Sequence, residues 1–475
     1  MSLATTIAVL DIGKTNAKLV CWDDATGQMV QETCRPNRSI EGSEYRYLDT
    51  DGLWNFYRNA LREAASIFDI GKLVVTTHGA TAAILQGDEL ALPVVDYENP
   101  IASAVSSAYD ALRDHFAQTF SPALPAGLNL GRQLFALEQS HGAILAQATD
   151  FLLYPQFWAF KLCGVKASEV TSLGCHTDIF MPFKGEFSDL AQKRGWAAKF
   201  PPLRKASDVL GTVRPELVAE LGLRPDCQVL CGIHDSNASL VPLFSQFTPP
   251  FALCSSGTWV INFAVQGAAR NTPTSHHRGN SRNRPLQEEL DTLCNVDLHG
   301  RPVPSSRFMG GREYAVLTSE CATVTPTQAD LQRVIANQSF ATPSFCDNGG
   351  PFARHGGRIH NASALTTDAE RVALACLYVA LMTDYCLDTV QARGPLVLEG
   401  PYAASPLLSS LMAALRAPRQ KVFTTHDTHG TAFGAAMLAF TSPDGRTRPY
   451  NHVLPAELDQ LAEYRHRWRL ALPNT

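Results

Sequence analysis

The chain has 475 residues, of which 45% are hydrophobic and 18% charged, and its 40 Lys and Arg against 45 Asp and Glu give a formal net charge of -5. This composition excludes disordered, collagen-like and coiled-coil proteins, and the length favours two or three domains. The small negative charge removes the main electrostatic reason to expect nucleic acid or an anionic membrane as a partner. The one basic segment, 276–284, is interpreted as a solvated loop rather than a polyanion site.

The cysteines and the apolar runs indicate the cellular compartment. Twelve cysteines are too sparse for a disulfide scaffold, and no two of them form a Cys-x-x-Cys pair, so we expect reduced and mostly buried thiols. The longest nearly apolar run, 372–382, is far shorter than the roughly 20 residues that cross a bilayer. The first residues lack the pattern of a secretory signal. These features predict a soluble, cytoplasmic protein.

The first part of the chain alternates between strands and a helix. Apolar strands are predicted at 7–10 and 17–22, joined by the polar turn 11–16. A helix is expected around 54–68 and a buried strand at 72–77. This alternation predicts an α/β domain.

A second hairpin repeats the opening pattern about half the chain length later. Strands 251–254 and 259–263 flank the turn 255–258, although the side chains differ from those of the first hairpin. Two similar lobes are therefore expected, with an N-terminal lobe over 1–247 and a C-terminal lobe over 248–475.

The C-terminal lobe carries two turns rich in small residues. A buried helix is predicted at 368–390 and a strand at 395–398, followed by the turn 399–405 and a helix at 406–415. Ligands favour such a turn at the carboxyl end of a strand. A second helix start, 428–436, has the small residues that allow close backbone approach.

The first turn contains Gly13, Lys14 and Thr15 but is not a P-loop, because Ala8 stands where the motif needs a glycine and a strand follows instead of a helix. An isolated Asp-x-Gly hairpin is usually structural, since both residues favour turns. The second turn, 255–258, is also rich in donors. Two such turns, one from each lobe, are the arrangement needed to hold a phosphate chain across a cleft.

Two aspartates follow strands and suggest phosphoryl transfer. Asp11 lies beside the first turn, where phosphate would repel a carboxylate unless a cation such as Mg²⁺ lay between them; the alternative is an Asx-turn that caps the hairpin. Asp235 stands at the start of a helix, where it could accept a proton from a substrate hydroxyl. The alternative for Asp235 is a helix N-cap, which would leave the paired hairpins unexplained.

These segments together resemble the FGGY family of carbohydrate kinases, which belongs to the two-lobed ATPases that include actin, hexokinase and the Hsp70 chaperones. The resemblance covers nearly the whole chain. It implies an α/β, two-lobed actin/hexokinase-like (ribonuclease H-like) fold with the active site in the cleft between the lobes. The segments that carry it are 11–16, 232–235, 255–259, 399–404 and 430–436.

The resemblance also implies ATP and Mg²⁺ as cofactors and a role for each matching residue. Asp235 would be the general base and, with Asp11, would hold the metal, while Gly400 and Ala404 would border the adenosine. The implied phosphate contacts are Gly13, Lys14, Thr15, Asn16, Lys18, Ser256, Gly257 and Thr258. The implied sugar contacts are His78, Gly79, Asp96, His234 and Asn295.

The His-Asp pair and the run 255–259 look most like the branch of L-fuculose and L-rhamnulose kinases, which implies a small ketose as substrate. Two departures bear on this. Thr81 stands where that branch usually has an aspartate, and 399–401 reads Glu-Gly-Pro instead of a glycine triplet. A ribulose- or xylulose-type kinase, an actin- or Hsp70-like nucleotide switch and a binding protein without turnover remain alternatives. The oligomeric state also stays open, with a homodimer among the alternatives.

Overall fold

The structure is a computed structural model that describes residues 5–267, 286–319, 321, 323–346, 349–353, 355–425, 429–442 and 448–473. The basic segment 276–284 lies outside the described residues. The chain divides into two compact units. The first comprises Met1–Gln246, Cys294–Pro302 and His429–Thr447, and the second comprises Phe247–Leu293, Val303–Thr428 and Arg448–Thr475. The first boundary lies next to the expected one, but 294–302 and 429–447, expected in the C-terminal lobe, are grouped with the first unit.

The first unit is built on a seven-stranded sheet of order β14-β15-β6-β1-β2-β3, with β16 also paired to β6. The strands β1, β6 and β16 run parallel, whereas β1 and β2 form the expected antiparallel hairpin. The strands are β1 (Thr5–Ile12), β2 (Asn16–Asp23), β3 (Met29–Pro36), β6 (Asp69–Thr77), β14 (Val209–Thr212), β15 (Gln228–Leu230) and β16 (Ile233–His234).

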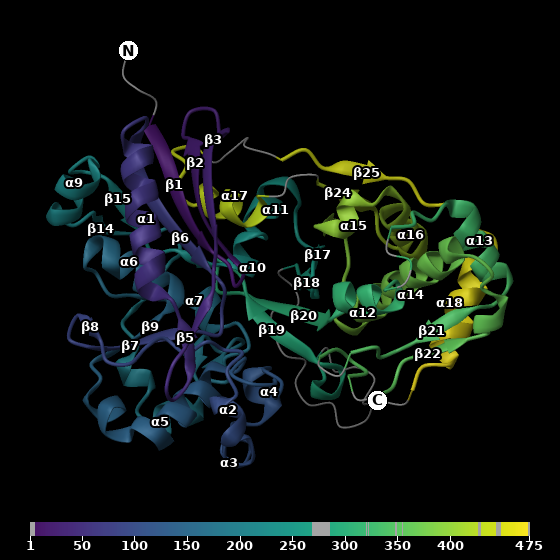
Figure 1. Cartoon of the computed structure of the whole chain (residues 1–475), viewed down its shortest axis with the longest axis horizontal. Helices are drawn as coiled ribbons and strands as arrows, with labels where there is room; N and C mark the ends of the chain where they lie inside the picture. Colours follow the sequence, from purple (N-terminus) through teal and green to yellow (C-terminus); the bar gives the residue numbers. More distant parts are fainter. Residues whose placement is uncertain are drawn as a thin grey trace. The chain divides into compact units, whose positions relative to one another are not determined.

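Successive side chains of β1 point to opposite faces of this sheet, and both faces are buried. Ala8 and Leu10 pack in a core cluster with residues of α1 (Thr50–Ala65) and α6 (Tyr154–Cys163). Their neighbours Ile7 and Val9 point to the other face and pack with residues of α17 (Gly430–Met437). In Figure 1 the yellow α17 accordingly lies beside the purple strands of the sheet. The helix α17, from the C-terminal part of the chain, thus completes the core of the first unit.

A second part of the first unit surrounds a three-stranded sheet of order β8-β7-β9. Its apolar residues form a separate core cluster that includes much of α5 and, from a distant part of the sequence, Val296. Its elements are β7 (Ala82–Gln86), β8 (Glu89–Leu90), β9 (Asp150–Leu153), α5 (Leu130–Gln147) and the short α7 (Val170–Leu173).

A seven-stranded sheet of order β19-β20-β18-β17-β23-β24-β25 belongs to the second unit, except for residues 294–296 of β19 and Pro302 of β20, which are grouped with the first. The predicted second hairpin is present as β17 and β18, and β23 runs parallel to β17. The strands are β17 (Phe251–Ser256), β18 (Val260–Val265), β19 (Thr292–Val296), β20 (Pro302–Phe308), β23 (Leu396–Glu399), β24 (Val422–Thr424) and β25 (Asn451–Val453). The helices of eight or more residues are α12 (Gly310–Leu317), α13 (Gln328–Ala336), α14 (Asp368–Thr389), α16 (Pro406–Arg416) and α18 (Leu461–Leu470).

The helix α14 is the central helix of this unit. A capping box between Thr367 and Glu370 starts it, as expected for a Thr-x-x-Glu sequence. By length and composition α14 could cross a membrane, with a mean hydropathy of 1.4, but 83% of the apolar window is buried inside the protein. It is therefore a core helix.

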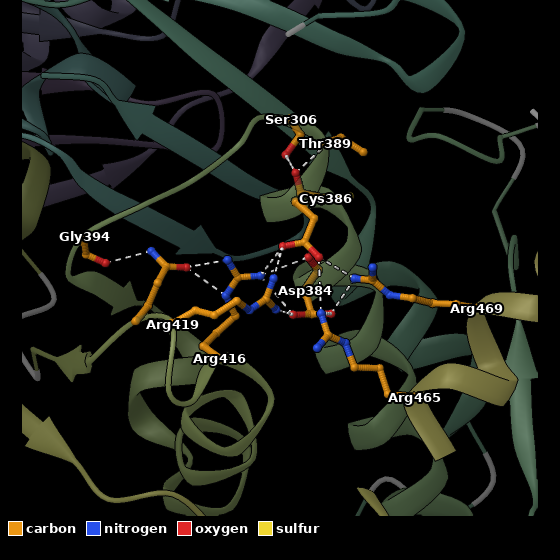
Figure 2. A network of polar contacts seen from close by, with 11 residues as sticks. Ser306, Asp384, Cys386, Thr389, Gly394, Arg416, Arg419, Arg465 and Arg469 are labelled. Atoms are coloured by element: carbon orange, nitrogen blue, oxygen red, sulfur yellow. Dashed lines mark hydrogen bonds and ion pairs between the residues drawn. The ribbon is translucent and has the colours of Figure 1, made fainter. Parts of the chain in front are cut away.

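A polar network joins α14 to α16 and α18 (Figure 2). Asp384 is fully buried, and its carboxylate pairs with Arg416 at 2.9 Å and with Arg465 and Arg469 at 2.7 Å each. Arg419 and the nearby Asp388 complete the network. The buried charge of Asp384 is thus compensated by arginines from two other segments.

All twelve cysteines are free thiols, and nine of them are buried, as the sequence predicts.

Candidate functional site

Three strand ends of the first unit meet at one edge of its sheet. Ile12 of β1 lies opposite Thr77 of β6, and His234 of β16 also pairs with Thr77. Because these strands are parallel, the residues that follow them lie at the same edge. The first turn, His78 and Asp235 are therefore brought together although they are far apart in the sequence.

The first turn is a tight hairpin whose backbone is held from both sides. Gly13 N–H donates to the Asn16 carbonyl at 2.9 Å, and Asn37 donates through its side chain to the Gly13 carbonyl at 2.8 Å. Thr15 and Asn16 are exposed. Beneath the turn, the buried Tyr57 hydroxyl donates to the carbonyls of Asp11 and Lys18, at 3.1 and 3.3 Å. The turn is therefore rigid, with Thr15 and Asn16 accessible to a ligand.

The two lysines expected at the phosphate have other partners in this structure. Lys14 forms an ion pair with Asp96, and its Nζ lies 4.9 Å from the centroid of the Tyr97 ring. Lys18 lies 3.3 Å from Glu32. Neither ammonium group is free, so any contact to phosphate would compete with these carboxylates.

Asp96, an expected sugar contact, is 1% exposed and already accepts several hydrogen bonds. Besides Lys14, the donors are the Ser39 hydroxyl at 2.6 Å, Arg46 Nε at 2.9 Å and Glu98 N–H at 3.0 Å. Burial alone would raise the pKa of Asp96, but the bonds from Lys14, Ser39 and Glu98 outweigh it and lower the pKa. The structure therefore shows Asp96 as the centre of a polar cluster that joins the first turn to neighbouring loops.

Asp235 is the first residue of the short helix α10 (Asp235–Ala238), with His234 as its N-cap. Its Oδ1 accepts from the Ser236 N–H at 2.5 Å and lies 3.2 Å from His234 Nε2. Oδ2 accepts no hydrogen bond from the described residues, and the side chain is 26% exposed. A local role at the helix start thus occupies one carboxylate oxygen and leaves the other available.

The Asp11 carboxylate accepts no hydrogen bond from the described residues. Asp11 therefore does not form the Asx-turn that was the alternative for this residue. Burial, together with the nearby negative charges of Asp235 and Glu32, raises its pKa to about 7, against the opposing effect of Lys18. A divalent cation would offset this repulsion. Mg²⁺ needs only one or two protein carboxylates beside phosphate and water ligands, so Asp11 and Asp235 fit it. Among the described residues no group of three or more His, Cys, Asp or Glu forms a metal site.

His78 directly follows β6 and is 5% exposed. Its Nδ1 contacts the Gly79 carbonyl at 3.1 Å, whereas the buried Nε2 has no hydrogen-bond partner among the described residues. Burial lowers the pKa of His78, which favours the neutral ring. Thr81, in place of the aspartate of the resembling branch, is buried and bonds to the Gly79 carbonyl at 3.1 Å. The unpaired Nε2 is a suitable group for a sugar hydroxyl.

Gly79 lies so close to His234 that a Cβ there would stand 2.7 Å from His234 Nε2. Asn295 is 4% exposed, near the end of β19, and belongs to the first unit. The structure therefore groups all five expected sugar contacts in the first unit, and four of them are buried, namely His78, Asp96, His234 and Asn295.

The second unit holds the other expected turns. The Gly257 N–H donates to the Trp259 carbonyl at 2.9 Å, which leaves Gly257 and Thr258 exposed at the tip of the hairpin. Ser256 is buried instead, and its hydroxyl donates to the Glu399 carbonyl and accepts from the Tyr402 N–H at 3.0 Å. Ser256 therefore joins the second turn to the turn after β23.

Gly400 is the N-cap of α15 (Pro401–Ala404), Ala404 is its last residue, and both are exposed. Because β17 and β23 are parallel neighbours, Gly400 follows its strand directly beside Ser256. A Cβ at Gly400 would lie 2.0 Å from the Ser256 carbonyl oxygen. The two turns are thus packed backbone against backbone, at the edge where the sequence predicts nucleotide binding.

Three structural features near these residues were not predicted from the sequence. Gly311, at the start of α12, packs against the second turn, with its Cβ position 2.1 Å from the Gly257 carbonyl oxygen. Glu169 is fully buried behind β16 and supports it through Thr171. Asn237 bonds to His234 at 2.6 Å. The Gly-Gly pair after a strand could have indicated the first feature, but no local pattern marks the other two.

Comparison with known proteins places this geometry in a family. The model of the N-terminal domain of the FGGY family of carbohydrate kinases matches residues 6–242, and that of the carbohydrate kinase FGGY C-terminal domain matches residues 248–448. The chain is also 36% identical to a carbohydrate kinase from Novosphingobium aromaticivorans of known crystal structure. That comparison covers 99% of this chain and 98% of the other, with a TM-score of 0.88.

More distant relatives are named for the particular sugar that they phosphorylate. The chain is 24% identical over 285 residues to the L-fuculokinase of Escherichia coli K12, and 26% identical over 266 residues to a rhamnulokinase from Oceanobacillus iheyensis. These matches cover 58% and 53% of this chain, and 60% and 54% of those proteins. A xylulose kinase from Lactobacillus acidophilus, at 13% identity and a TM-score of 0.79 over 98% of this chain and 96% of that one, shares the fold.

The predicted two-lobed, actin/hexokinase-like α/β fold is therefore confirmed, and with it the resemblance noted in the sequence. With both family models covering most of the sequence and a relative matched over nearly its full length, the chain belongs to the FGGY family of carbohydrate kinases.

Proposed function

We propose that this protein transfers the terminal phosphoryl group of ATP to a hydroxyl of a small sugar in the cytoplasm, with Asp235 as general base. The observation that carries the proposal is the meeting of three parallel strand ends, which places Asp11, His78 and Asp235 at one edge of a sheet. A proton acceptor, a group for a hydroxyl and a carboxylate for the metal are the parts that such a reaction requires.

Asp235 takes the proton in this proposal. Its Oδ2 has no hydrogen bond from the described residues, so it can accept the proton of a sugar hydroxyl as that oxygen attacks the phosphorus. The neutral His78 offers its unpaired Nε2 to a second hydroxyl and so orients the sugar. Asp11 and Asp235 would hold Mg²⁺, which when bound neutralises the phosphate charge.

The second unit would bind the nucleotide. Thr258 is exposed at the tip of its hairpin, and Gly400 and Ala404 are exposed beside it on the next turn. Thr258 would contribute a hydroxyl and backbone N–H to a phosphate, and Gly400 lets the chain approach the adenosine without a side chain. The exposed Thr15 and Asn16 would play the corresponding role in the first unit.

The sugar is a ketose of the L-fuculose or L-rhamnulose type in this proposal. Support comes from the similarity to an L-fuculokinase and a rhamnulokinase, each over slightly more than half of this chain. Thr81 argues for a modified pocket, because its hydroxyl is turned toward Gly79 and no carboxylate is present at that position to hold sugar hydroxyls. A ribulose- or xylulose-type ketose is therefore the second candidate.

A substrate panel tests the proposal. Purified protein with Mg²⁺ and ATP is incubated with L-fuculose-, L-rhamnulose-, ribulose- and xylulose-type ketoses, with aldoses and with polyols, and sugar-dependent ADP release is measured. We expect one class of ketose to be phosphorylated and Asp235→Asn to abolish this while the protein still binds ADP. The matched control is Asp226→Asn, an exposed aspartate paired with Arg224, which should keep full activity. Near-normal turnover by Asp235→Asn would contradict the role of Asp235, and ATP hydrolysis that no sugar changes would contradict the proposed reaction.

A further inference from the structure

The strand that leads to Asp235 is short and lies beside a single strand. β16 comprises only Ile233 and His234, and β6 is its one strand partner among the described residues. The position of β16 therefore depends on contacts outside the sheet. One of these is a hydrogen bond from the His234 N–H to Thr171 Oγ1, at 3.2 Å.

The Thr171 hydroxyl joins two buried groups. Thr171 is the second residue of α7, and Glu169 is the N-cap of this helix; both side chains are fully buried. The Thr171 hydroxyl lies 2.5 Å from Glu169 Oε2 and also contacts the His234 N–H. Glu169, Thr171 and His234 thus form a continuous hydrogen-bonded chain within the first unit.

The partners of Glu169 fix the direction of this chain. Its Oε2 also accepts from the Thr171 N–H at 3.0 Å and from the Ser172 N–H at 3.2 Å. A backbone N–H can only donate, so Oε2 is an accepting oxygen whether or not the other oxygen of the carboxyl carries a proton. The Thr171 hydroxyl therefore donates its hydrogen to Glu169 and turns a lone pair toward the His234 N–H.

The residues just before β16 are held by another buried side chain. Gln156 of α6 is fully buried, and its Nε2 donates to the carbonyls of Cys231 and Gly232, at 3.0 and 3.3 Å. Asp235 follows directly after β16, and its Oδ1 accepts from the Ser236 N–H at 2.5 Å. Because the carboxylate is held by the start of α10, its direction depends on where the backbone of β16 ends.

We propose that Thr171 is a positioning residue for Asp235: it holds the His234 N–H and so fixes the point at which β16 ends and α10 begins, while Glu169 fixes the direction of its hydroxyl. This inference rests on the proposed function of Asp235. A general base must lie within hydrogen-bond reach of the hydroxyl that it deprotonates. A displacement of about 1 Å can lower the rate about 100-fold.

Thr171→Val tests the proposal in the full-length protein, because valine has nearly the same shape as threonine but no hydroxyl. With Mg²⁺, ATP and the best sugar of the panel, we expect kcat to fall about 10- to 100-fold, with KM for ATP unchanged. Thr171→Ser, which restores a hydroxyl, should recover most of the lost kcat. A wild-type kcat in Thr171→Val, or no recovery in Thr171→Ser, would overturn the proposal.

A matched control separates positioning from the general loss of a buried hydrogen bond. Thr177 is another buried threonine of the first unit, and its hydroxyl donates to the Leu173 carbonyl. Thr177→Val and Thr171→Val should both lower the melting temperature, but only Thr171→Val should lower kcat. An equal kcat loss in the two variants would overturn the proposal. Should Thr171→Val not fold, the smaller Thr171→Ala is compared with Thr177→Ala in the same way.

Hydrogen exchange of the His234 amide needs no substrate. We expect this amide to exchange slowly in the wild type and in Thr171→Ser, and faster in Thr171→Val. The His78 amide, which donates to the Ile12 carbonyl at 3.0 Å, should exchange equally in all three. Fast exchange of the His234 amide in the wild type would overturn the inference, whereas an active Asp235→Asn enzyme would overturn the proposed function; the two failures are therefore distinguishable.

Discussion

The ammonium group of Lys14 forms an ion pair with the buried carboxylate of Asp96. The pair joins the first turn, expected to bind phosphate, to a residue expected to bind the sugar. Asp96 also accepts from Ser39 and Arg46, so its carboxylate organises three segments of the first unit. Both residues thus have a structural partner before any ligand is considered.

The first prediction concerns this pair. Asp96→Asn should lower the stability of the first unit by about 2 kcal/mol, because it removes the buried negative charge that pairs with two cations and replaces one acceptor oxygen by an NH2 group. Lys14→Met should cost less and leave KM for ATP unchanged, since its ammonium is engaged by Asp96. Thermal denaturation and ATP kinetics measure both effects. Glu98→Gln is the control, because Glu98 is 58% exposed and lies 3.7 Å from Lys14. A large rise in KM for ATP in Lys14→Met would instead indicate a lysine that leaves Asp96 for phosphate.

The second prediction concerns Gly400. Its φ of 73° and ψ of -152° belong to a region that only glycine adopts readily, and a Cβ would lie 2.0 Å from the Ser256 carbonyl oxygen. Gly400→Ala should therefore separate the two turns and abolish ADP binding in calorimetry. Gly300→Ala is a matched control, because Gly300 also has a positive φ of 74° but nothing within 4 Å of its Cβ position. That variant should lose about 1 kcal/mol of stability and keep ADP binding; equal ADP affinity in the two variants would contradict the prediction.

The third prediction is a pH dependence caused by Glu169. Burial raises its pKa from 4.5 to about 7, although Thr171 and Ser172 donate hydrogen bonds that oppose the rise. As the pH rises from about 4.5 to 7, the unfolded chain loses this proton first, so Glu169 reduces folding stability over that interval. Glu169→Gln removes the titration. The stability of the variant minus that of the wild type should therefore increase by about 2 kcal/mol between pH 5 and pH 8.

Chemical denaturation at several pH values measures this difference. A constant offset from the altered hydrogen bonds cancels, because only the change with pH is compared. Parallel stability curves for Glu169→Gln and wild type would show that the carboxyl titrates normally in the folded protein.

The fourth prediction concerns the buried network of α14. Arg416 is 2% exposed and pairs with both Asp384 and Asp388, so Arg416→Met should destabilise the second unit by about 3 kcal/mol by leaving carboxylate charge less compensated. Arg467→Met is the control, because the Arg467–Glu463 pair on α18 is about half exposed and should contribute little. Thermal unfolding followed by hydrogen exchange in α14 measures the effect. Similar melting temperatures for the two variants would contradict it.

Local patterns predicted much of the fold. Alternating apolar residues and polar turns indicated both hairpins, β1–β2 and β17–β18, and the apolar segment 368–390 indicated α14, which the structure has as Asp368–Thr389. The sequence also predicted that the catalytic candidate follows a strand, because the run at 232–235 contains a strand end and a helix start. These features depend on residues that are neighbours in the sequence, and for that reason they can be predicted from the sequence.

Contacts between distant residues could not be predicted in the same way. Nothing near Lys14 in the sequence indicates that it would form an ion pair with Asp96. Nothing near Asn237 indicates that its side chain would donate a hydrogen bond to the Val296 carbonyl. The residues 294–302 and 429–442 also belong to the first unit, although their sequence position placed them in the second lobe. Such pairings are set by packing of the whole chain, and a single sequence contains no direct record of them.

The position of α17 has a consequence for how the protein is made. Phe433 and Ala435, near its middle, pack on Ile7 and Val9 of the first strand, and the Ala439 carbonyl accepts from Lys72 at 2.6 Å. The ribosome therefore has to release more than nine-tenths of the polypeptide before the earliest strand is covered on both faces. Until then the nascent chain displays an apolar surface, and such a surface favours aggregation during synthesis.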